Sequence, residues 1–164
     1  MPPHICTRII FIALAWLWPL VVTASSLTAP LLTIQPGKLS QAGRPPMTLD
    51  RTSLLALPQS SMDTGVPWHD GPARFEGPLL SSLMESLGVH GETLVVTGLD
   101  GYSIRIPLAE AYEMDAMMAH SCNGKFLSIR DLGPLILLYP KGEGLSSQQR
   151  MFRTVWQVSH IRVE

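Results

Sequence analysis

Two Asx-Gly dipeptides, each next to an apolar segment, constrain the fold of this chain more than any other feature. Asp100-Gly101 separates residues 93–99, which are rich in β-branched side chains, from residues 102–106, where apolar and polar residues alternate. Asn123-Gly124 follows a second apolar segment at 117–120. Asx-Gly dipeptides between such segments are typical of tight hairpin turns of two residues. The sequence therefore predicts antiparallel strands in its second half.

Short apolar runs bounded by Gly, Pro and polar residues predict the remaining strands. Residues 135–139 are apolar throughout, which predicts a central strand buried on both faces. The polar, Gly- and Ser-rich stretch 141–149 is then expected to be a loop, and 155–163 a final strand. Further strands are expected at 31–34 and, with weaker patterning, at 60–67.

Helical patterns are few and short. Residues 49–57 predict one helix, capped by Asp50 or Thr52. Pro78 is placed for the first turn of a second helix with one apolar stripe, and residues 108–112 predict a third. Strands dominate and no regular βαβ alternation appears, so we expect an α+β domain with a mixed β-sheet and short helices.

The N-terminus indicates the compartment. Arg8 is the only Lys, Arg, Asp or Glu residue before position 25, and it precedes the apolar run 9–22. That run falls within the length of about 7 to 15 residues of a secretory signal sequence and is shorter than the roughly 20 residues that span a bilayer. We expect a signal peptide at 1–24, cleaved after Ala24, and a single periplasmic or secreted domain at 25–164. A retained membrane anchor is the alternative.

Charge and cysteine content narrow the possible functions. Twelve Lys and Arg residues against 13 Asp and Glu residues give a net charge of −1, without the basic surface that nucleic-acid binding requires. Cys6 lies in the predicted signal peptide, so Cys122 is left without an internal disulfide partner and the core must supply the stability. His120 and His160 have no metal-site spacing, and Glu110 is expected on the surface.

Three motifs occur in the order of a known family: DGYSIRIPL at 100–108, NGKFL at 123–127 and GPLILLYP at 133–140. With the segments at 75–80 and 155–161, they resemble the molybdopterin-binding domain of the sulfite oxidase superfamily over about residues 60–164. The chain is most similar to the short, exported, single-domain members, the oxidoreductase molybdopterin-binding domain proteins. This resemblance implies the same α+β fold with a mixed sheet.

The resemblance also indicates a cofactor cleft. In the full enzymes a cysteine thiolate ligates molybdenum four positions before a tryptophan that matches Trp68, and the position here is Thr64. A neutral hydroxyl does not replace a soft, anionic thiolate as a ligand. Of two basic positions before the last strand, Arg153 keeps the charge and Trp156 stands at the other. The resemblance places five residues in the cleft: Trp68, Tyr102, Arg130, Arg153 and Trp156.

Three functions follow as hypotheses. The missing thiolate favours an exported ligand-binding or sensing module, with no cofactor expected, that takes a small anionic ligand or a partner protein at the cell envelope. Lys141 and Arg150 add positive charge for an anion, although a solvated loop with scattered charges fits them equally. The alternative is a molybdopterin-dependent oxidoreductase with an atypical metal site. The third is an interaction protein whose loop at 141–149 docks a partner. Membrane contact is expected only through an uncleaved signal peptide.

Overall fold

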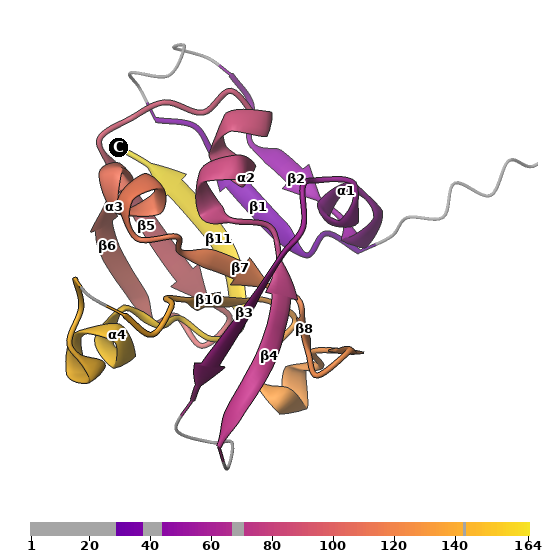
Figure 1. Ribbon diagram of the computed structural model, residues 1–164. Helices are drawn as coiled ribbons and strands as arrows, with labels where there is room; N and C mark the ends of the chain where they lie inside the picture. The colour runs from indigo at the N-terminus through magenta and orange to yellow at the C-terminus, as the bar shows by residue number, and fades with distance from the viewer. Residues whose placement is uncertain (1–28, 38–43, 67–70, 143) are drawn as a thin grey trace, which may run out of the picture.

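The computed structural model describes residues 29–37, 44–66, 71–142 and 144–164 (Figure 1). The predicted signal peptide and Trp68 lie outside these described residues. Within them no helix is long and apolar enough to cross a membrane. The strands form mixed sheets with a few short helices around them, which confirms the α+β class.

The largest sheet has five strands in the order β2-β1-β11-β5-β6, and β1 and β11 run parallel while its other pairs are antiparallel. A second, four-stranded sheet has the order β3-β4-β8-β9 and is antiparallel. Strands β7 and β10 form an antiparallel ribbon of their own. The bounds are β1 Leu32–Gln35, β2 Met47–Leu49, β3 Ser60–Gly65, β4 Pro72–Gly77, β5 Thr93–Gly98, β6 Ser103–Pro107, β7 Met117–Ala119, β8 Ser121–Cys122, β9 Lys125–Phe126, β10 Ile136–Leu138 and β11 Val158–Val163.

Both predicted turns form hairpins, but the strand predicted at 117–120 is β7, which pairs with β10 and is not an arm of the Asn123-Gly124 hairpin. The Asn123-Gly124 turn joins β8 to β9 with φ of 48° and 74°, the left-handed pair that a two-residue type I′ turn needs. The β5–β6 connection is one residue longer than predicted. Gly101 has φ of 84°, and Gly98 N–H donates to the Tyr102 carbonyl at 2.9 Å, which is a three-residue loop ending in a left-handed glycine.

The four α-helices of the described chain are α1 Arg51–Leu55, α2 Leu80–Ser86, α3 Leu108–Glu113 and α4 Ser147–Arg153, with a 3₁₀ turn at Ile129–Asp131. Asp50 caps α1 as predicted, accepting from Ser53 N–H at 2.8 Å. The prediction for Pro78 was wrong, because the helix begins at Leu80. The Pro78 carbonyl instead accepts from Met118 N–H on β7 at 2.9 Å, which keeps this segment extended.

Two hydrophobic cores explain the arrangement of the sheets. The larger core packs the five-stranded sheet against α2 and α3, and the smaller one lies on the inner face of the four-stranded sheet. Strand β10 is buried on both faces, as predicted, since Leu135 and Leu137 face the larger core while Ile136 and Leu138 face the smaller. It is not a central strand, because its ladder partner is β7, with one further bridge from Leu137 to Val155.

Two of the elements that the sequence prediction missed, β4 and α4, line cavities. Strand β4 alternates inward Ala73 and Phe75 with outward Arg74 and Glu76, a period of two obscured by the prolines at its ends. Helix α4 occupies part of the stretch predicted to be a loop, and the structure extends it to Arg153. Each of these two elements forms part of the wall of a cavity, α4 of one and β4 of the other.

Candidate functional site

Helix α4 forms one wall of a cavity of about 340 Å³, here called the α4 cleft. The opposite wall is the end of β3 with the residue after it, and the floor is the end of β10. The cleft therefore combines segments that are far apart in sequence. Its described lining residues are Thr64, Gly65, Val66, Leu138, Tyr139, Lys141, Ser147, Arg150, Met151, Thr154 and Trp156.

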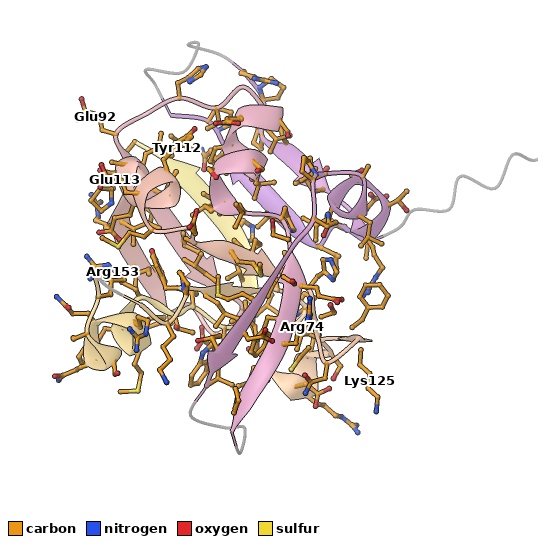
Figure 2. All side chains as sticks on the ribbon, viewed as in Figure 1. Arg74, Glu92, Tyr112, Glu113, Lys125 and Arg153 are labelled. Atoms are coloured by element: carbon orange, nitrogen blue, oxygen red, sulfur yellow. The ribbon has the colours of Figure 1, made fainter. Side chains whose placement is uncertain are left out.

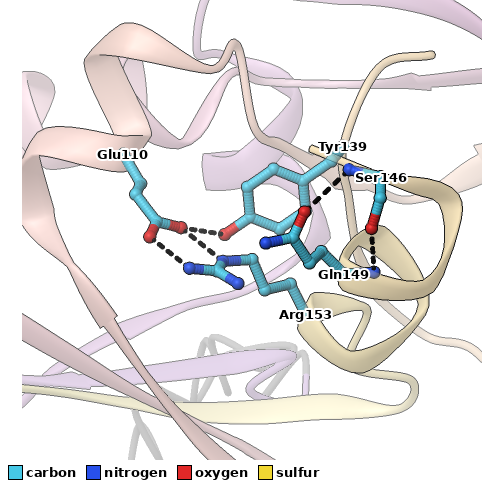
Figure 3. Close-up of polar contacts among 5 residues, drawn as sticks. All are labelled: Glu110, Tyr139, Ser146, Gln149 and Arg153. Atoms are coloured by element: carbon cyan, nitrogen blue, oxygen red, sulfur yellow. Dashed lines mark hydrogen bonds and ion pairs between the residues drawn. The ribbon is translucent and has the colours of Figure 1, made fainter. Parts of the chain in front are cut away.

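A capping box starts α4 and fixes its direction. Ser146 Oγ accepts from Gln149 N–H at 3.2 Å, and Gln149 Oε1 accepts from Ser146 N–H at 2.8 Å (Figure 3). After the helix, Val155 and Leu137 exchange backbone hydrogen bonds of 2.8 and 3.3 Å. The helix is thus anchored at both ends, and its residues Arg150 and Thr154 stand one turn apart beside the cleft.

The charge of the α4 cleft is positive. Lys141 and Arg150 both line it, and no carboxylate is present among its described lining residues. Arg150 is held in place, since its Nη1 donates to the Leu145 carbonyl at 2.7 Å and its Nη2 donates to Ser147 Oγ at 3.0 Å. A half-enclosed basic cavity attracts anions, because nearby apolar walls weaken the screening by water.

A buried carboxylate ties α4 to α3 behind the cleft. Both oxygens of Glu110 accept from Arg153, at 2.8 Å from Nε and 2.7 Å from Nη2 (Figure 3). Tyr139 Oη donates to the same carboxylate at 3.5 Å. The side chain of Glu110 is 10% exposed and that of Arg153 is 31% exposed. This two-pronged geometry is the strong form of a charged hydrogen bond, so it fixes the position of α4.

The ionisation states in this cluster follow from the same contacts. Hydrogen bonding to Glu110 raises the pKa of Arg153, whose charge is therefore permanent. Burial raises the pKa of Tyr139, and the negative charge of Glu110 raises it further. Tyr139 consequently stays a neutral donor throughout the physiological pH range. The Glu110 and Arg153 charges cancel, so the net charge of the neighbouring cleft comes from Lys141 and Arg150.

The structure brings some of the predicted site residues together and separates others. Thr64, 5% exposed, and Trp156, 39% exposed, both line the α4 cleft. Arg153 turns its guanidinium to Glu110 instead. Tyr102 lies exposed beside α4, where its Oη donates to the Phe152 carbonyl at 3.3 Å. Arg130 is exposed in the 3₁₀ turn and is not a lining residue of this cleft.

The lining residues fit the anionic part of a pterin cofactor but not its metal. Lys141 and Arg150 suit a phosphate, while the described lining offers no thiolate, imidazole or carboxylate. Cys122 is no substitute for a thiolate at Thr64. It pairs with Phe75 on the far side of β4, whereas Thr64 pairs with Ala73, which puts the two positions about 12 Å apart by strand geometry. Burial also raises the pKa of the Cys122 thiol, which disfavours the thiolate. We therefore derive no metal-dependent step.

The described part of the chain contains no group of three or more His, Cys, Asp or Glu side chains that could hold a metal ion. The site residue that sequence reasoning missed is Glu110, which was expected on the surface and is buried. Its pairing with Arg153 spans 43 positions, so no local spacing indicates it. The one available signal is Tyr139 in a buried apolar strand, because a buried tyrosine hydroxyl needs a partner.

The fold and the cleft define a small α+β domain with a cavity between α4, β3 and β10 whose described lining is basic. The family model of the oxidoreductase molybdopterin-binding domain matches residues 49–158. This match covers more than half of the 164 residues, and the protein belongs to that family. A search of curated proteins gave no significant match. The matched range includes all described residues that line the α4 cleft.

Proposed function

We propose that this protein is an exported ligand-binding module that holds an anionic ligand in the α4 cleft without metal chemistry. The observation that carries the proposal is the charge of the lining, which has Lys141 and Arg150 and no carboxylate among its described residues. Thr64 stands at the position that the family resemblance gives to the metal-ligating cysteine. The scaffold then keeps a binding cleft for an anion while the chemistry of the metal is lost.

The walls of the cleft also indicate the shape of the ligand. Trp156, which is 39% exposed, contributes aromatic surface next to the two cations. A planar ring that carries a phosphate matches both features, because the ring packs on aromatic side chains and the phosphate accepts charged hydrogen bonds. Phenyl phosphate is therefore a suitable probe, and phenol is its uncharged counterpart.

Calorimetric titration with phenyl phosphate tests the proposal. Binding is expected for the wild type, and Lys141→Ala and Arg150→Ala are each expected to weaken it about tenfold, the equivalent of 1.4 kcal/mol for one charged hydrogen bond. Arg150→Lys keeps the charge and should retain part of the affinity. Lys125→Ala and Arg130→Ala are matched controls, since both side chains are exposed outside the cleft. Equal affinity for phenol, or unchanged affinity in both cleft variants, would contradict the proposal.

Export rests on the N-terminal sequence. The single charge of Arg8 before the apolar run 9–22 supports secretion and cleavage after Ala24. Fractionation of cells that express the full chain with a C-terminal tag tests this directly. A protein in the periplasm or medium that begins at Ser25 supports the proposal, and an unprocessed chain in the membrane fraction supports the retained anchor.

A molybdopterin-dependent oxidoreductase with an atypical metal site is the second candidate, and family membership favours it. In this case Arg153 would not hold the pterin directly, since its guanidinium is bound to Glu110. The variant Thr64→Cys separates the two candidates. If the wild type holds no metal because Thr64 replaces the cysteine that ligates molybdenum, Thr64→Cys restores this ligand. The variant is then expected to contain molybdenum when it is made in a host that produces the cofactor. Stoichiometric molybdenum in the wild type favours the oxidoreductase.

A further inference from the structure

A second cavity, of about 510 Å³, lies on the outer face of the four-stranded sheet, and we call it the sheet cavity. Its floor consists of outward-facing residues of β3, β4 and β8, while Leu55 of α1 and Phe126 of β9 form an apolar rim. Its lining residues differ entirely from those of the α4 cleft: Leu55, Gln59, Ser60, Ser61, Arg74, Glu76, His120, Ser121, Gly124 and Phe126. Arg74, from this cavity, and Arg153 lie on different sides of the molecule in Figure 2.

Hydrogen bonds hold one wall of this cavity in a single arrangement. Gln59 Nε2 donates to the carbonyls of Leu54 and Leu57, at 2.9 and 2.8 Å, so both amide hydrogens are used. Gln59 Oε1, 2.9 Å from His120 Nε2, must therefore accept, and His120 carries its hydrogen on Nε2. His120 is 7% exposed, and its Nδ1 has no hydrogen-bond partner among the described residues. Burial lowers the pKa of His120, which favours the neutral form of the ring at neutral pH.

The two charged residues of the floor are also held in place. Arg74 Nη2 donates to Ser61 Oγ at 2.9 Å, and Ser121 Oγ donates to Glu76 Oε2 at 3.0 Å. Arg74 and Glu76 are two residues apart on β4 and both face outward, so their Cα atoms are about 7 Å apart. With His120 neutral, the described lining presents one cation and one carboxylate, side by side, next to an apolar rim.

A ligand that matches this lining carries both charges on one small polar end and an apolar group on the other. We propose that the sheet cavity binds a free α-amino acid with an apolar side chain. Its carboxylate binds the Arg74 guanidinium, its ammonium binds the Glu76 carboxylate, and its side chain packs against Leu55 and Phe126. A ligand with a single charge pairs with only one of the two side chains and leaves the other without an opposite charge from the ligand, which lowers affinity.

The rim supports this orientation. The Arg51 guanidinium stacks over the Phe126 ring, 4.2 Å from its centroid, and the His120 ring lies tilted against the same ring at 5.5 Å. Phe126 is thereby held at the mouth while 52% of its surface stays exposed. An apolar side chain that covers Phe126 and Leu55, itself 40% exposed, removes apolar surface from water on binding.

Calorimetric titration of the mature protein with L-leucine tests this proposal. The matched probes are 4-methylpentanoate, which lacks the ammonium, 3-methylbutylamine, which lacks the carboxylate, and D-glucose as a neutral polyol. L-Leucine is expected to bind at least tenfold more tightly than either singly charged analogue, and D-glucose is expected not to bind. The variants Arg74→Gln and Glu76→Gln should each weaken leucine binding at least tenfold, while Lys125→Ala, beside the cavity but outside its lining, should not.

Several results overturn the proposal. The proposal is wrong if millimolar leucine, phenylalanine and methionine give neither binding heat nor a shift of melting temperature. It is also wrong if leucine and 4-methylpentanoate bind with equal affinity. Binding of D-glucose in place of leucine refutes the ligand class. Circular dichroism of each variant checks that the fold is kept, and Ser61→Ala supplies a milder variant that only releases Arg74 from its anchor. Its affinity should fall between those of the wild type and Arg74→Gln.

Discussion

The α4 cleft and the sheet cavity differ in charge and in how their walls are made. The described lining of the α4 cleft has two cations. The cleft is built from β3, the end of β10 and α4, and an ion pair between Glu110 and Arg153 holds the helix. The described lining of the sheet cavity has one cation and one carboxylate on a single strand, and hydrogen bonds from the two neighbouring strands orient both. One cavity is suited to an anion, and the other to a zwitterion.

This difference shows which part of the fold determines the geometry of each cavity. A site made on neighbouring strands takes its geometry from the sheet itself, because side chains two residues apart share a face. A site made between a helix and two strand ends depends on whatever positions the helix. For α4 this is the Glu110–Arg153 pair, which acts on the cleft through the helix and through Tyr139, a lining residue that donates to Glu110. The predictions below perturb the two cavities separately.

The largest effect is expected from Glu110→Ala. It leaves Arg153 without its carboxylate and Tyr139 without its acceptor, and loss of one partner of such a pair costs about 3 kcal/mol. Urea denaturation measures the loss, and phenyl phosphate affinity should fall because α4 is released. Glu113→Ala, on the exposed face of α3, is the control and should change stability by less than about 0.5 kcal/mol. A loss below about 1 kcal/mol for Glu110→Ala would disprove the tether.

A crossed titration sharpens the comparison of the two cavities. Lys141→Ala is expected to weaken phenyl phosphate binding about tenfold and to leave L-leucine binding unchanged. Arg74→Gln should do the reverse. Both results follow from the separate linings, and calorimetry of the two variants with both ligands measures them. If either variant changes both affinities alike, the two cavities do not act as independent sites.

A smaller effect is expected at α1, which carries part of the rim of the sheet cavity. Asp50→Ala removes the acceptor for Ser53 N–H and should lower the free energy of unfolding by about 1 kcal/mol. Thermal or urea unfolding checks this. Ala56→Ser, at the other end of the same helix, is a control with an exposed side chain. The cap assignment fails if Asp50→Ala is as stable as the wild type.

The smallest effect concerns pH. Burial is the main cause that lowers the pKa of His120 from its ordinary value of 6.5. The His120 ring therefore binds a proton at a higher pH in the unfolded chain than in the folded protein. The stability contributed by the neutral, buried ring is complete above pH 6.5. It is lost as the pH falls below 6.5, because protonation then favours the unfolded chain. His120→Gln should flatten the decline between about pH 7 and pH 5. An equal slope in wild type and His120→Gln would contradict the assignment.

The sequence predicts the elements whose signals are local. The turn at Asn123-Gly124, the Asp50 cap and the alternation in β6 depend on residues within a few positions of one another, and the structure contains all three. The β10 segment shows a feature that local sequence signals do not predict. Its burial on both faces is visible in its composition, but its partner β7 and its place between two cores are set by the packing of distant segments.

The candidate site also contains contacts that local sequence signals do not predict. Thr64 and Trp156 were placed through the family motifs, and they do line one cleft. Arg153 was assigned to a ligand through the family resemblance and its charge, whereas its partner Glu110 is 43 positions away and only folding brings them together. The capping box at Ser146 and Gln149 was a local signal for α4 that the polar composition of the stretch concealed.

The central claim is that this family member binds an anion in the α4 cleft without metal chemistry. Elemental analysis for molybdenum, with fluorescence detection of oxidised pterin, on mature protein exported from a host that makes the cofactor, tests it most directly. We expect molybdenum far below one atom per chain, together with binding of phenyl phosphate by the same sample. One molybdenum atom per chain would contradict the claim and establish the cleft as a metal site with an unusual ligand.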